Sequence, residues 1–440
     1  MLANCEVASD STPSAVDQLN KSCFCGGVDR DALIRELKDN AFTPDALEKL
    51  QEDRPGLFSA HPVFVNSSDV KKMTAIIGAV EHVVGVPAYR QHVLSDAPEI
   101  AHHKAKAQGV FFGYDFHLAA DGPKLIEINT NAGGALLNSA LIRAQRALCT
   151  PVQTMVPPLP QRRFSDQAFV DMFLCEWDLA SRNFPLRTVA IVDNNPVQQY
   201  LYPEFLLFQG LLEKYGISVV IADLKELEFK NGIVVCRGKR LDLVYNRLTD
   251  FYFDEPECTV LRDAYFADAL VVTPHPRAHA LYANKRNLAI LSDPDSLRSF
   301  GIAASWIDIL ATGIPKTETV TPGNASRLWQ ARRKLFFKPV SGFAGKAVYR
   351  GDKLTKRAWN DILAGDYVAQ HFVSPSERHI NYGDANGPFK VDIRNYVYQG
   401  RVQLLAARTY QGQTTNFRTS GGGFASVVSI PQSQSKVTTP

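Results

Sequence analysis

A carboxylate and a carboxamide two residues apart are the first chemical signal in the chain. Glu127 and Asn129 lie in the stretch LIEINTNAGG, which ends in a glycine pair that we interpret as flexible. Because side chains alternate across a β-strand, the two residues would share one face. Carboxylate and amide oxygens are hard ligands of the kind that Mg²⁺ binds. The spacing therefore predicts a metal-binding strand.

A hairpin would place a third polar side chain beside these two. Residues 109–131 read as two strands around a turn at 120–122. Asp115 falls on the first strand, and Glu127 and Asn129 fall on the second. A hairpin of this length brings the three side chains together at its open end.

A lysine followed by a glycine-rich turn is a second signal. Lys338 ends an apolar strand in FFKPVSGFAGKAVYRG, and residues 341–346 form the turn. Glycine lets main-chain N–H groups approach phosphate oxygens, and lysine adds positive charge. The spacing is not that of a Walker A motif. An ordinary hairpin with a glycine turn explains this stretch equally well when it is considered alone.

Several arginines converge in the last part of the sequence, DIRNYVYQGRVQLLAARTYQGQTTNFRTSGGG. Asp392 and Arg394 share a face of one strand, Arg408 lies on the next strand, and Asn416 precedes three glycines. Phosphoryl transfer needs positive charge where negative charge develops on the γ-phosphate. The alternative is a set of surface ion pairs.

The middle of the chain has an alternating α/β pattern. Apolar strands are predicted at 187–193, 217–223, 241–247 and 269–273, with an amphipathic helix at 203–215. This order predicts a small, mostly parallel, doubly wound sheet. Ligands of such sheets bind beyond the carboxyl ends of the strands, where Glu204 and Arg247 fall. Lys285 begins a helix after the last strand, although a single lysine is weak evidence for a site.

Helical patterns account for much of the first third of the chain. We predict helices at 31–40 and 135–148, and a longer helix capped by Ser67 or Ser68. That longer helix has apolar residues at a period near 3.6, namely Met73, Ile76, Ile77, Val80, Val83 and Val84. The Pro-rich stretch at 150–163 indicates a boundary between lobes.

Length and composition narrow the class of protein. The chain has 440 residues, which predicts two or three domains or lobes. It is 45% apolar and 21% charged, and its net charge of +3 is too small to predict a nucleic-acid partner. No apolar run approaches the roughly 20 residues of a transmembrane helix, and the N-terminus lacks a secretory signal. We therefore predict a cytoplasmic protein without a membrane partner.

Seven cysteines are scattered along the chain, which argues against a disulfide framework. Cys23 and Cys25 are close, but a C-x-C pair is half a metal site at best without a second Cys/His pair. We interpret them as thiols in a mobile N-terminal segment, because residues 1–28 are polar and predicted to be disordered.

Taken together, these pieces resemble the ATP-grasp superfamily. The stretch 392–422 is similar to ribosomal-protein glutamate ligases in its order of Asp-Ile-Arg, a strand pair, an arginine, Phe-Arg and Gly-Gly. In those ligases a Gly-Val-Asp strand and a Glu-x-Asn strand follow directly. Here their counterpart, residues 109–134, lies upstream. The order resembles a circularly permuted ATP-grasp protein, with the layout of eukaryotic glutathione synthetases and glutathionylspermidine synthetases.

The resemblance implies an α/β fold class with two kinds of lobe: a doubly wound pre-ATP-grasp lobe and an antiparallel-sheet ATP-binding lobe. The implied divisions are a helical part with the relocated hairpin at 29–150, the pre-ATP-grasp domain at 187–290, the ATP-grasp domain at 291–430 and a flexible tail at 431–440.

The resemblance also implies roles for individual residues, with ATP and Mg²⁺ as the cofactors. Asp115, Glu127 and Asn129 would bind Mg²⁺, and Arg394, Arg408 and Asn416 would be catalytic. ATP would contact Lys285, Lys338, Ser341, Gly342, Gly345, Lys346, Gln370, Phe372 and Val373. The sequence departs from many relatives at His371, where a ribose-binding glutamate is common; Glu377 or Asp366 could replace it. It also has Phe343-Ala344 in the glycine-rich turn, where polar residues are common.

The implied activity is ATP-dependent ligation of a carboxylate and an amine through an acyl phosphate. The partners would be small-molecule substrates of an amino-acid or peptide-like kind, with Glu204 and Arg247 holding the substrate amine and carboxylate. Two alternatives remain open: a nucleotide-binding sensor or scaffold without ligase activity, and a small-molecule kinase on the same fold. The sequence does not identify the acid or the amine.

Overall fold

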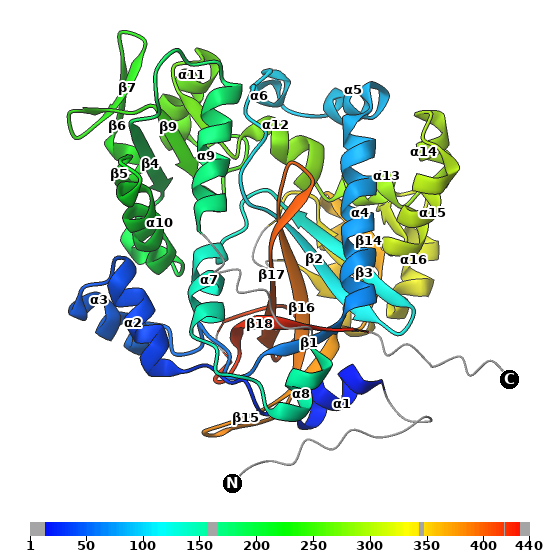
Figure 1. The fold of residues 1–440 in the computed structure, drawn as a ribbon. Helices are drawn as coiled ribbons and strands as arrows, with labels where there is room; N and C mark the ends of the chain where they lie inside the picture. Colours follow the sequence, from blue (N-terminus) through cyan, green and yellow to red (C-terminus); the bar gives the residue numbers. More distant parts are fainter. Residues whose placement is uncertain (1–13, 157–165, 343–346, 418, 432–440) are drawn as a thin grey trace, which may run out of the picture.

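A seven-stranded sheet built from early and late parts of the chain carries the predicted site (Figure 1). The structure is a computed structural model that describes residues 14–156, 166–342, 347–417 and 419–431. The main path of the sheet is β1 (Val63–Asn66), β18 (Gly423–Ile430), β17 (Arg401–Tyr410), β16 (Ala385–Tyr398), β2 (Phe112–Ala119) and β3 (Gly122–Asn129). β15 (Ser376–Tyr382) pairs with β16 off this path.

The hairpin predicted at 109–131 forms β2 and β3, with its turn at 120–121. β2 pairs antiparallel with β16, so a hairpin from the first third of the chain extends a sheet made by the last quarter. Figure 1 shows the cyan hairpin lying beside the orange strands.

Helices cover both faces of this sheet. The helix predicted after residue 66 is α4 (Ser67–Gly85), and its six predicted apolar residues are all buried. Its N-cap is Asn66, without a capping hydrogen bond from the side chain, so the predicted serine cap is wrong. α4 and α15 (Ala304–Gly313) pack on one face, over Tyr114 and Ile393. α7 (Ala135–Arg143) lies on the other face, with Tyr396 and Phe424.

The predicted parallel sheet is confirmed, in the order β10 (Val271–Thr273), β9 (Leu243–Asn246), β4 (Thr188–Asp193) and β5 (Ser218–Asp223). α9 (Gln167–Leu179) and α10 (Tyr202–Lys214) pack on one face of it, and α11 (Thr259–Phe266) packs on the other. The sheet is therefore doubly wound. A turn at Asn231-Gly232 joins β6 (Leu227–Lys230) to β7 (Ile233–Cys236), and β8 (Lys239–Arg240) completes a small sheet.

A second antiparallel sheet has the order β11 (Thr317–Thr319), β14 (Tyr367–His371), β12 (Leu335–Pro339) and β13 (Tyr349–Arg350). One face is apolar and packs through Phe337 and Ala369 against α16 (Ala325–Ala331) and α17 (Lys356–Ala364). Because side chains alternate along a strand, Lys338 and Gln370 belong to the opposite face. That face looks toward the hairpin β2–β3.

The N-terminal region differs from the prediction of disorder over 1–28. Residues 15–22 form α1 (Ala15–Ser22), and Cys23 is fully buried after it. Val16, Leu19 and Cys23 pack against Phe64 of β1 and Val428 of β18. The sequence 1–28 is polar overall, but these spaced apolar residues are enough to anchor a helix to the sheet edge.

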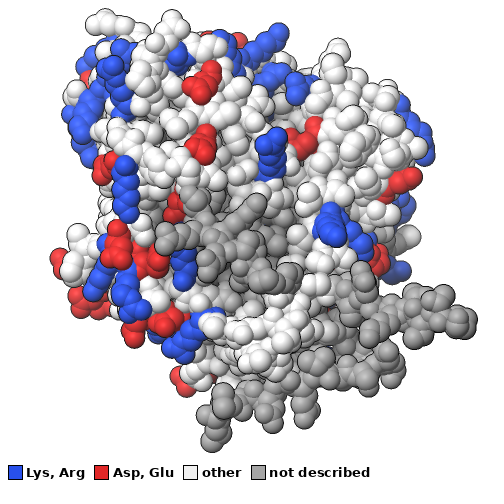
Figure 2. Space-filling model, viewed as in Figure 1, with Lys and Arg blue, Asp and Glu red and all other residues white. Residues whose placement is uncertain are grey.

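The remaining helices connect these sheets. They are α2 (Arg30–Asn40), α3 (Pro44–Asp53), α5 (Pro87–Ser95), α6 (Glu99–His102), α8 (Thr150–Met155), α12 (Pro276–Ala278), α13 (Arg286–Leu291) and α14 (Pro294–Ser299). Within the described residues, no helix is both long enough and apolar enough to cross a membrane. Figure 2 shows acidic and basic side chains interspersed on the face that carries α2 and α3.

Candidate active site

Asp115 and Arg394 form the centre of the candidate site. Asp115 on β2 lies opposite Arg394 on β16, so the two side chains share one face of the sheet. Arg394 donates through Nε to Oδ1 and through Nη2 to Oδ2 of Asp115, both at 2.6 Å. Burial alone would lower the pKa of Arg394, but the charge of Asp115 outweighs this effect and raises it. The two-pronged contact fixes the orientation of the guanidinium.

Arg408 on β17 lies between two carboxylates. Its Nη2 is 3.0 Å from Oδ2 of Asp115 and 3.3 Å from Oδ2 of Asp392. Its Nε is buried and has no hydrogen-bond partner among the described residues. Buried N–H groups are rarely left unpaired in folded proteins. This atom is therefore placed to donate to an acceptor that binds in the site.

Asp392 collects hydrogen bonds that the sequence did not reveal. His117 Nε2 and the Tyr410 hydroxyl lie 2.9 Å and 3.0 Å from its Oδ1, and the Thr415 hydroxyl donates to Oδ2. Burial would raise the pKa of Asp392, but the hydrogen bond and charge of His117, together with Arg408, hold it well below its usual range. Asp392 is thus a buried anion that orients Arg408.

His117 was missed by the sequence reasoning, although a signal was present. It is two residues after Asp115 on the same strand, so it shares that residue's face. Its Nδ1 lies 2.8 Å from the carbonyl oxygen of Val373, and its Nε2 contacts Asp392. Both ring nitrogens thus lie within hydrogen-bond distance of protein oxygen atoms. His117 links the arginine cluster to the strand end at Val373.

The three predicted metal ligands do converge, but Asp115 is already engaged. Glu127 is the register partner of Asp115, and Asn129 Nδ2 donates to Asp115 Oδ2 at 3.0 Å. Arg394 adds two hydrogen bonds to this carboxylate, and Arg408 forms an ion pair with it. In this structure Asp115 anchors the arginines. Glu127 and the Oδ1 atom of Asn129 are the oxygens that a cation can reach without displacing those bonds.

Glu127 also meets the two lysines predicted to contact ATP. Its Oε1 lies 3.2 Å from Nζ of Lys285, which precedes α13 and donates to the carbonyl of Gly342 at 2.7 Å. Burial would raise the pKa of Glu127, but the charges of Lys285 and Lys338 hold it below its usual value. The carboxylate is therefore ionised, as a metal ligand must be.

Lys338 joins the second antiparallel sheet to the hairpin. Its Nζ donates to the carbonyl of Ile126 on β3 at 2.8 Å and to Oε1 of Gln370 on β14 at 2.9 Å. Burial lowers the pKa of Lys338 to about 8, while the charge of Glu127 opposes that shift and the charge of Lys285 adds to it. Two buried lysines close to one carboxylate leave excess positive charge, which suits a phosphate chain.

Three residues predicted to contact ATP, Gln370, Phe372 and Val373, lie at the end of β14 and just beyond it. Gln370 is buried, accepts from Lys338 and donates to Thr317 Oγ1 at 3.1 Å. Phe372 and Val373 line a cavity of about 610 Å³. Arg350 lies over the Phe372 ring, 4.7 Å from its centroid. This segment thus offers an apolar surface, whereas the N–H of Phe372 donates to the carbonyl of Lys334 and the carbonyl of Val373 lies against His117.

The glycine-rich turn is described only in part. Ser341 is exposed and Gly342 accepts from Lys285, whereas Gly345 and Lys346 lie outside the described residues. Asn416, predicted to be catalytic, donates to the carbonyl of Gln411 at 2.7 Å and accepts from the hydroxyl of Thr419 at 3.1 Å. These contacts hold its loop, and no contact between Asn416 and the predicted metal ligands is seen in the described part of the chain.

Glu204, predicted to hold a substrate amine, instead accepts hydrogen bonds from main-chain N–H groups of the protein. Its Oε2 accepts from the N–H of Gly134 at 2.7 Å and its Oε1 from that of Leu136 at 3.2 Å. Burial raises the pKa of Glu204, although Arg247 and these N–H groups oppose the shift. The carboxylate therefore caps the N-terminus of α7, where negative charge is favourable.

Arg247 lies between Glu204 and the loop that follows β3. Its Nη1 donates to Oδ1 of Asn131 and to the Tyr245 hydroxyl at 3.3 Å. Its Nε is buried without a partner among the described residues. Arg247 therefore remains available to an anion, whereas Glu204 is occupied.

Glycines near the site are close-packed rather than flexible. A Cβ atom on Gly134, whose φ is +101°, would lie 2.2 Å from Cζ of Phe424, and one on Gly133 would lie 2.6 Å from Nη2 of Arg247. A Cβ on Gly113 would lie 2.6 Å from that of Ala132 and 3.1 Å from Nε of Arg394. The interpretation of 133–134 as a flexible pair is wrong, because the glycines are needed for close approach.

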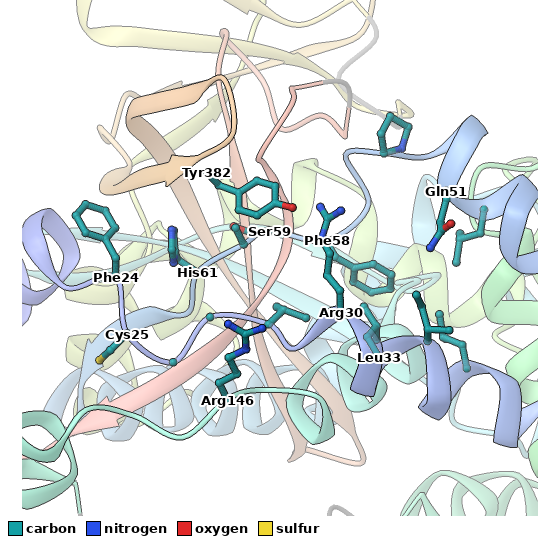
Figure 3. Close-up of a pocket in the computed structure, with 18 of the residues that line it drawn as sticks. Phe24, Cys25, Arg30, Leu33, Gln51, Phe58, Ser59, His61, Arg146 and Tyr382 are labelled. Atoms are coloured by element: carbon teal, nitrogen blue, oxygen red, sulfur yellow. The ribbon is translucent and has the colours of Figure 1, made fainter. Parts of the chain in front are cut away.

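The donor set fits Mg²⁺ and a nucleotide phosphate chain. Glu127 and Asn129 offer hard oxygens, and the buried Nε of Arg408, which has no partner among the described residues, offers an anion contact beside them. A separate cavity of about 890 Å³, lined by residues that include Arg30, His61 and Arg146, contains none of these groups (Figure 3). Although that cavity is larger, we assign the site to the converging charged side chains, since size alone supplies no chemistry.

Comparison with known proteins finds relatives by structure alone. No family model and no curated protein matches the sequence. A glutathione synthetase-like effector from Globodera pallida, solved in the apo form, matches with a TM-score of 0.54 and 13% identity over 89% of this chain and 99% of that chain. A putative gamma-glutamylcysteine synthetase from Methylobacillus flagellatus matches with a TM-score of 0.45 and 11% identity, over 79% and 83% of the two chains. An ATP-grasp ligase bound to a minimal precursor matches with a TM-score of 0.31 and 13% identity, over 56% of this chain and 90% of that chain.

Proposed function

We propose that this chain, which has the ATP-grasp fold, is an ATP- and Mg²⁺-dependent ligase that joins a carboxylate to an amine. The observation that carries the proposal is the convergence of Glu127, two buried lysines and the Asp115–Arg394–Arg408 cluster at the meeting of two antiparallel sheets. The pairing of β2 with β16 supports the further proposal that the chain is circularly permuted.

ATP would lie between the hairpin β2–β3 and the second antiparallel sheet. The adenine would lie beside Phe372 and Val373, and the phosphates would reach Lys285 and Lys338. Bound Mg²⁺, held by Glu127 and Asn129, would neutralise charge on the phosphates. Since Lys285 now pairs with Glu127 at 3.2 Å, it can transfer to a phosphate oxygen when Glu127 binds the cation.

Arg394 and Arg408 would stabilise the transfer of the γ-phosphoryl group to the substrate carboxylate. Arg394 is buried, Arg408 is largely buried, and both are oriented by Asp115, so they need little reorganisation when charge develops. Attack of an amine on the resulting acyl phosphate would form the amide and release phosphate. Asp115 would act mainly as a positioning residue for these arginines. We also propose that it contributes to metal binding.

The substrate would approach from the side of the parallel sheet. Arg247 would bind a substrate carboxylate, because its buried Nε lacks a partner among the described residues. Glu204 would act indirectly, by holding the glycine pair and the start of α7 in place. We propose small amino-acid or peptide-like substrates; the acid and the amine are not identified by these residues.

The experiment is an acyl-phosphate trap. Purified protein is incubated with ATP, Mg²⁺, hydroxylamine and pools of amino acids and short peptides, and hydroxamate and ADP are measured. Wild type should form both products in equal amounts, and Glu127→Gln should form neither. Glu48→Gln, an exposed change on α3, is the matched control and should retain activity.

Each other outcome has a definite meaning. ATP binding without ADP release across the substrate pools would support a sensor or scaffold. A phosphorylated product without hydroxamate would support a kinase. Equal ADP release by wild type and Glu127→Gln would contradict the assignment of Glu127 to the metal.

A further inference from the structure

Three cysteine thiols lie together in the fold, outside the candidate active site. Cys23 and Cys25 follow α1, and Cys149 precedes α8. Their sulfur atoms lie within 4.8 Å of one another, and those of Cys23 and Cys25 are 3.0 Å apart. A disulfide needs about 2.05 Å, so these two sulfurs are not bonded to each other. The half-site read from the C-x-C pair thus gains a third sulfur from a distant segment.

The chain is shaped to bring the two segments together. Gly26 has a φ of +71°, and a Cβ atom there would lie 2.5 Å from Cδ2 of Leu148, next to Cys149. The N–H of Arg146 donates to the carbonyl of Gly27 at 2.9 Å, and Val28 forms a β-bridge with Gln145. Main-chain bonds therefore fix the approach on one side of the thiols, and a glycine permits it.

A buried cation lies beside the thiols without a carboxylate. Arg378 is fully buried, and its guanidinium donates to main-chain carbonyls that include those of Cys23, Pro62 and Asn20. Among the described residues it forms no ion pair with Asp or Glu. A buried positive charge is stable when an anion lies nearby.

The surroundings of the thiols are otherwise apolar. Cys23 packs with Val16, Leu19 and Phe64, and Cys25 and Cys149 lie against the same cluster. Three thiolates in such a place would repel one another unless a cation held them. A divalent cation with three thiolates carries one net negative charge, which the guanidinium of Arg378 balances.

We propose that Cys23, Cys25 and Cys149 bind one Zn²⁺ ion. In a tetrahedral site with Zn–S bonds of about 2.3 Å, the sulfurs lie about 3.8 Å apart, so small shifts from the present positions are enough. Thiolates favour Zn²⁺ over the hard Mg²⁺ of the active site. The ion would tie the segment after α1 to the loop before α8, and thereby hold the N-terminal helix against the sheet edge.

The fourth position of the ion would face the cavity of about 890 Å³. Cys25 and Cys149 line this cavity together with His61 and Arg146 (Figure 3). His61 Nε2 contacts the carbonyl of Asn381 at 3.0 Å, while its buried Nδ1 has no partner among the described residues. This proposal does not depend on the ligase activity.

The test uses metal binding by the whole protein. Reduced, chelator-treated wild type is titrated with Co²⁺ and then Zn²⁺. We expect about one Co²⁺ per chain with thiolate-to-cobalt absorption in the near ultraviolet, abolished by Zn²⁺. Cys25→Ser and Cys149→Ser should each weaken binding by about a hundredfold or more. Cys175→Ser, a partly buried thiol on α9 outside the cluster, should bind as wild type does.

A second measurement needs no variant and so is independent of misfolding. Iodoacetamide labelling followed by peptide mass spectrometry should show that Zn²⁺ protects Cys23, Cys25 and Cys149 but leaves Cys175 unchanged. Absence of Co²⁺ and Zn²⁺ binding by wild type would overturn the proposal. So would a Cys23–Cys25 disulfide in protein purified without oxidant, or an equal loss of binding in Cys175→Ser.

Discussion

Arg394 reaches across from β16 and donates one hydrogen bond to each carboxylate oxygen of Asp115 on β2. The two residues come from strands nearly three hundred positions apart in the chain, and their contact depends on the pairing of an early hairpin with a late strand. The same carboxylate also forms an ion pair with Arg408, so one buried anion orients two cations. Loss of Asp115 would leave buried Arg394 without its carboxylate partner.

Arg394→Lys should lower the rate of substrate-dependent ADP release by about a hundredfold or more. Lysine keeps the charge but cannot form the two-pronged contact with Asp115, so the cation is no longer fixed where charge develops. Stopped assays of ADP with an acid found in the hydroxamate screen measure the effect. Arg401→Lys, an exposed change at the β16–β17 turn, is the control. A rate close to wild type in Arg394→Lys would remove this arginine from the mechanism.

Gly113→Ala should destabilise the protein by about 1–3 kcal/mol and reduce activity. The added methyl group would lie 2.6 Å from the Cβ of Ala132 and 3.1 Å from Nε of Arg394, so the guanidinium must move away from Asp115. Urea unfolding and the ADP assay measure the two effects.

Gly78→Ala is the matched control for this change. Gly78 lies inside α4, and a Cβ atom there meets nothing within 4 Å. Alanine should therefore stabilise that helix by up to about 1 kcal/mol and leave activity unchanged. A Gly113→Ala variant that behaved like Gly78→Ala would show that the arginine tolerates the added methyl group.

The sequence contained enough local information to predict the helices and strands and part of the candidate site. The apolar spacing of α4 and the alternation along β2 and β3 are properties of neighbouring residues, and both predictions are confirmed. The role of Glu204 as a cap of α7 could not be predicted, because it depends on packing between segments 70 residues apart. Likewise, the glycine at 134 is required by Phe424, which only the folded sheet brings near.

Affinity for ATP should fall as the pH rises through about 8. The pKa of Lys338 is lowered to about 8 by burial, so the free protein loses this positive charge above that pH. Anionic ATP favours the protonated lysine, and binding above pH 8 should therefore be accompanied by proton uptake. Isothermal titration calorimetry with MgATP at pH 7, 8 and 9, in buffers of different ionisation enthalpy, measures both quantities.

The variant Lys338→Met tests whether Lys338, rather than another titrating group, causes the pH dependence of ATP affinity. The variant should bind ATP more weakly at pH 7 and lose most of the dependence on pH between 7 and 9. If Lys338→Met kept the slope of wild type, another group would account for it, and Lys338 would not be in contact with the nucleotide.

Asp193→Asn should stabilise the protein at neutral pH but not at pH 4. Burial raises the pKa of Asp193 from 3.8 to about 6, although Arg247 opposes the shift. The folded state therefore favours the protonated carboxyl, and this contribution to stability is present below pH 4 and lost as the pH rises through 6. Asparagine stays neutral and can still accept from the N–H of Asn194, as Asp193 does at 2.8 Å. The gain should reach at most about 3 kcal/mol at pH 7.

Urea unfolding at pH 4, 5, 6 and 7 measures the difference between Asp193→Asn and wild type. The exposed substitution Asp308→Asn on α15 is the control, and it should show no such rise across the series. The difference in the free energy of unfolding between Asp193→Asn and wild type should grow steadily between pH 4 and 7. Asp193 must lose its proton in the folded wild type over this range, whereas asparagine has no proton to lose. A constant difference at every pH would mean that Asp193 is as readily ionised in the folded chain as in the unfolded one. In that case its position at the carboxyl end of β4, beside Arg247, would stabilise the charged form as much as burial disfavours it.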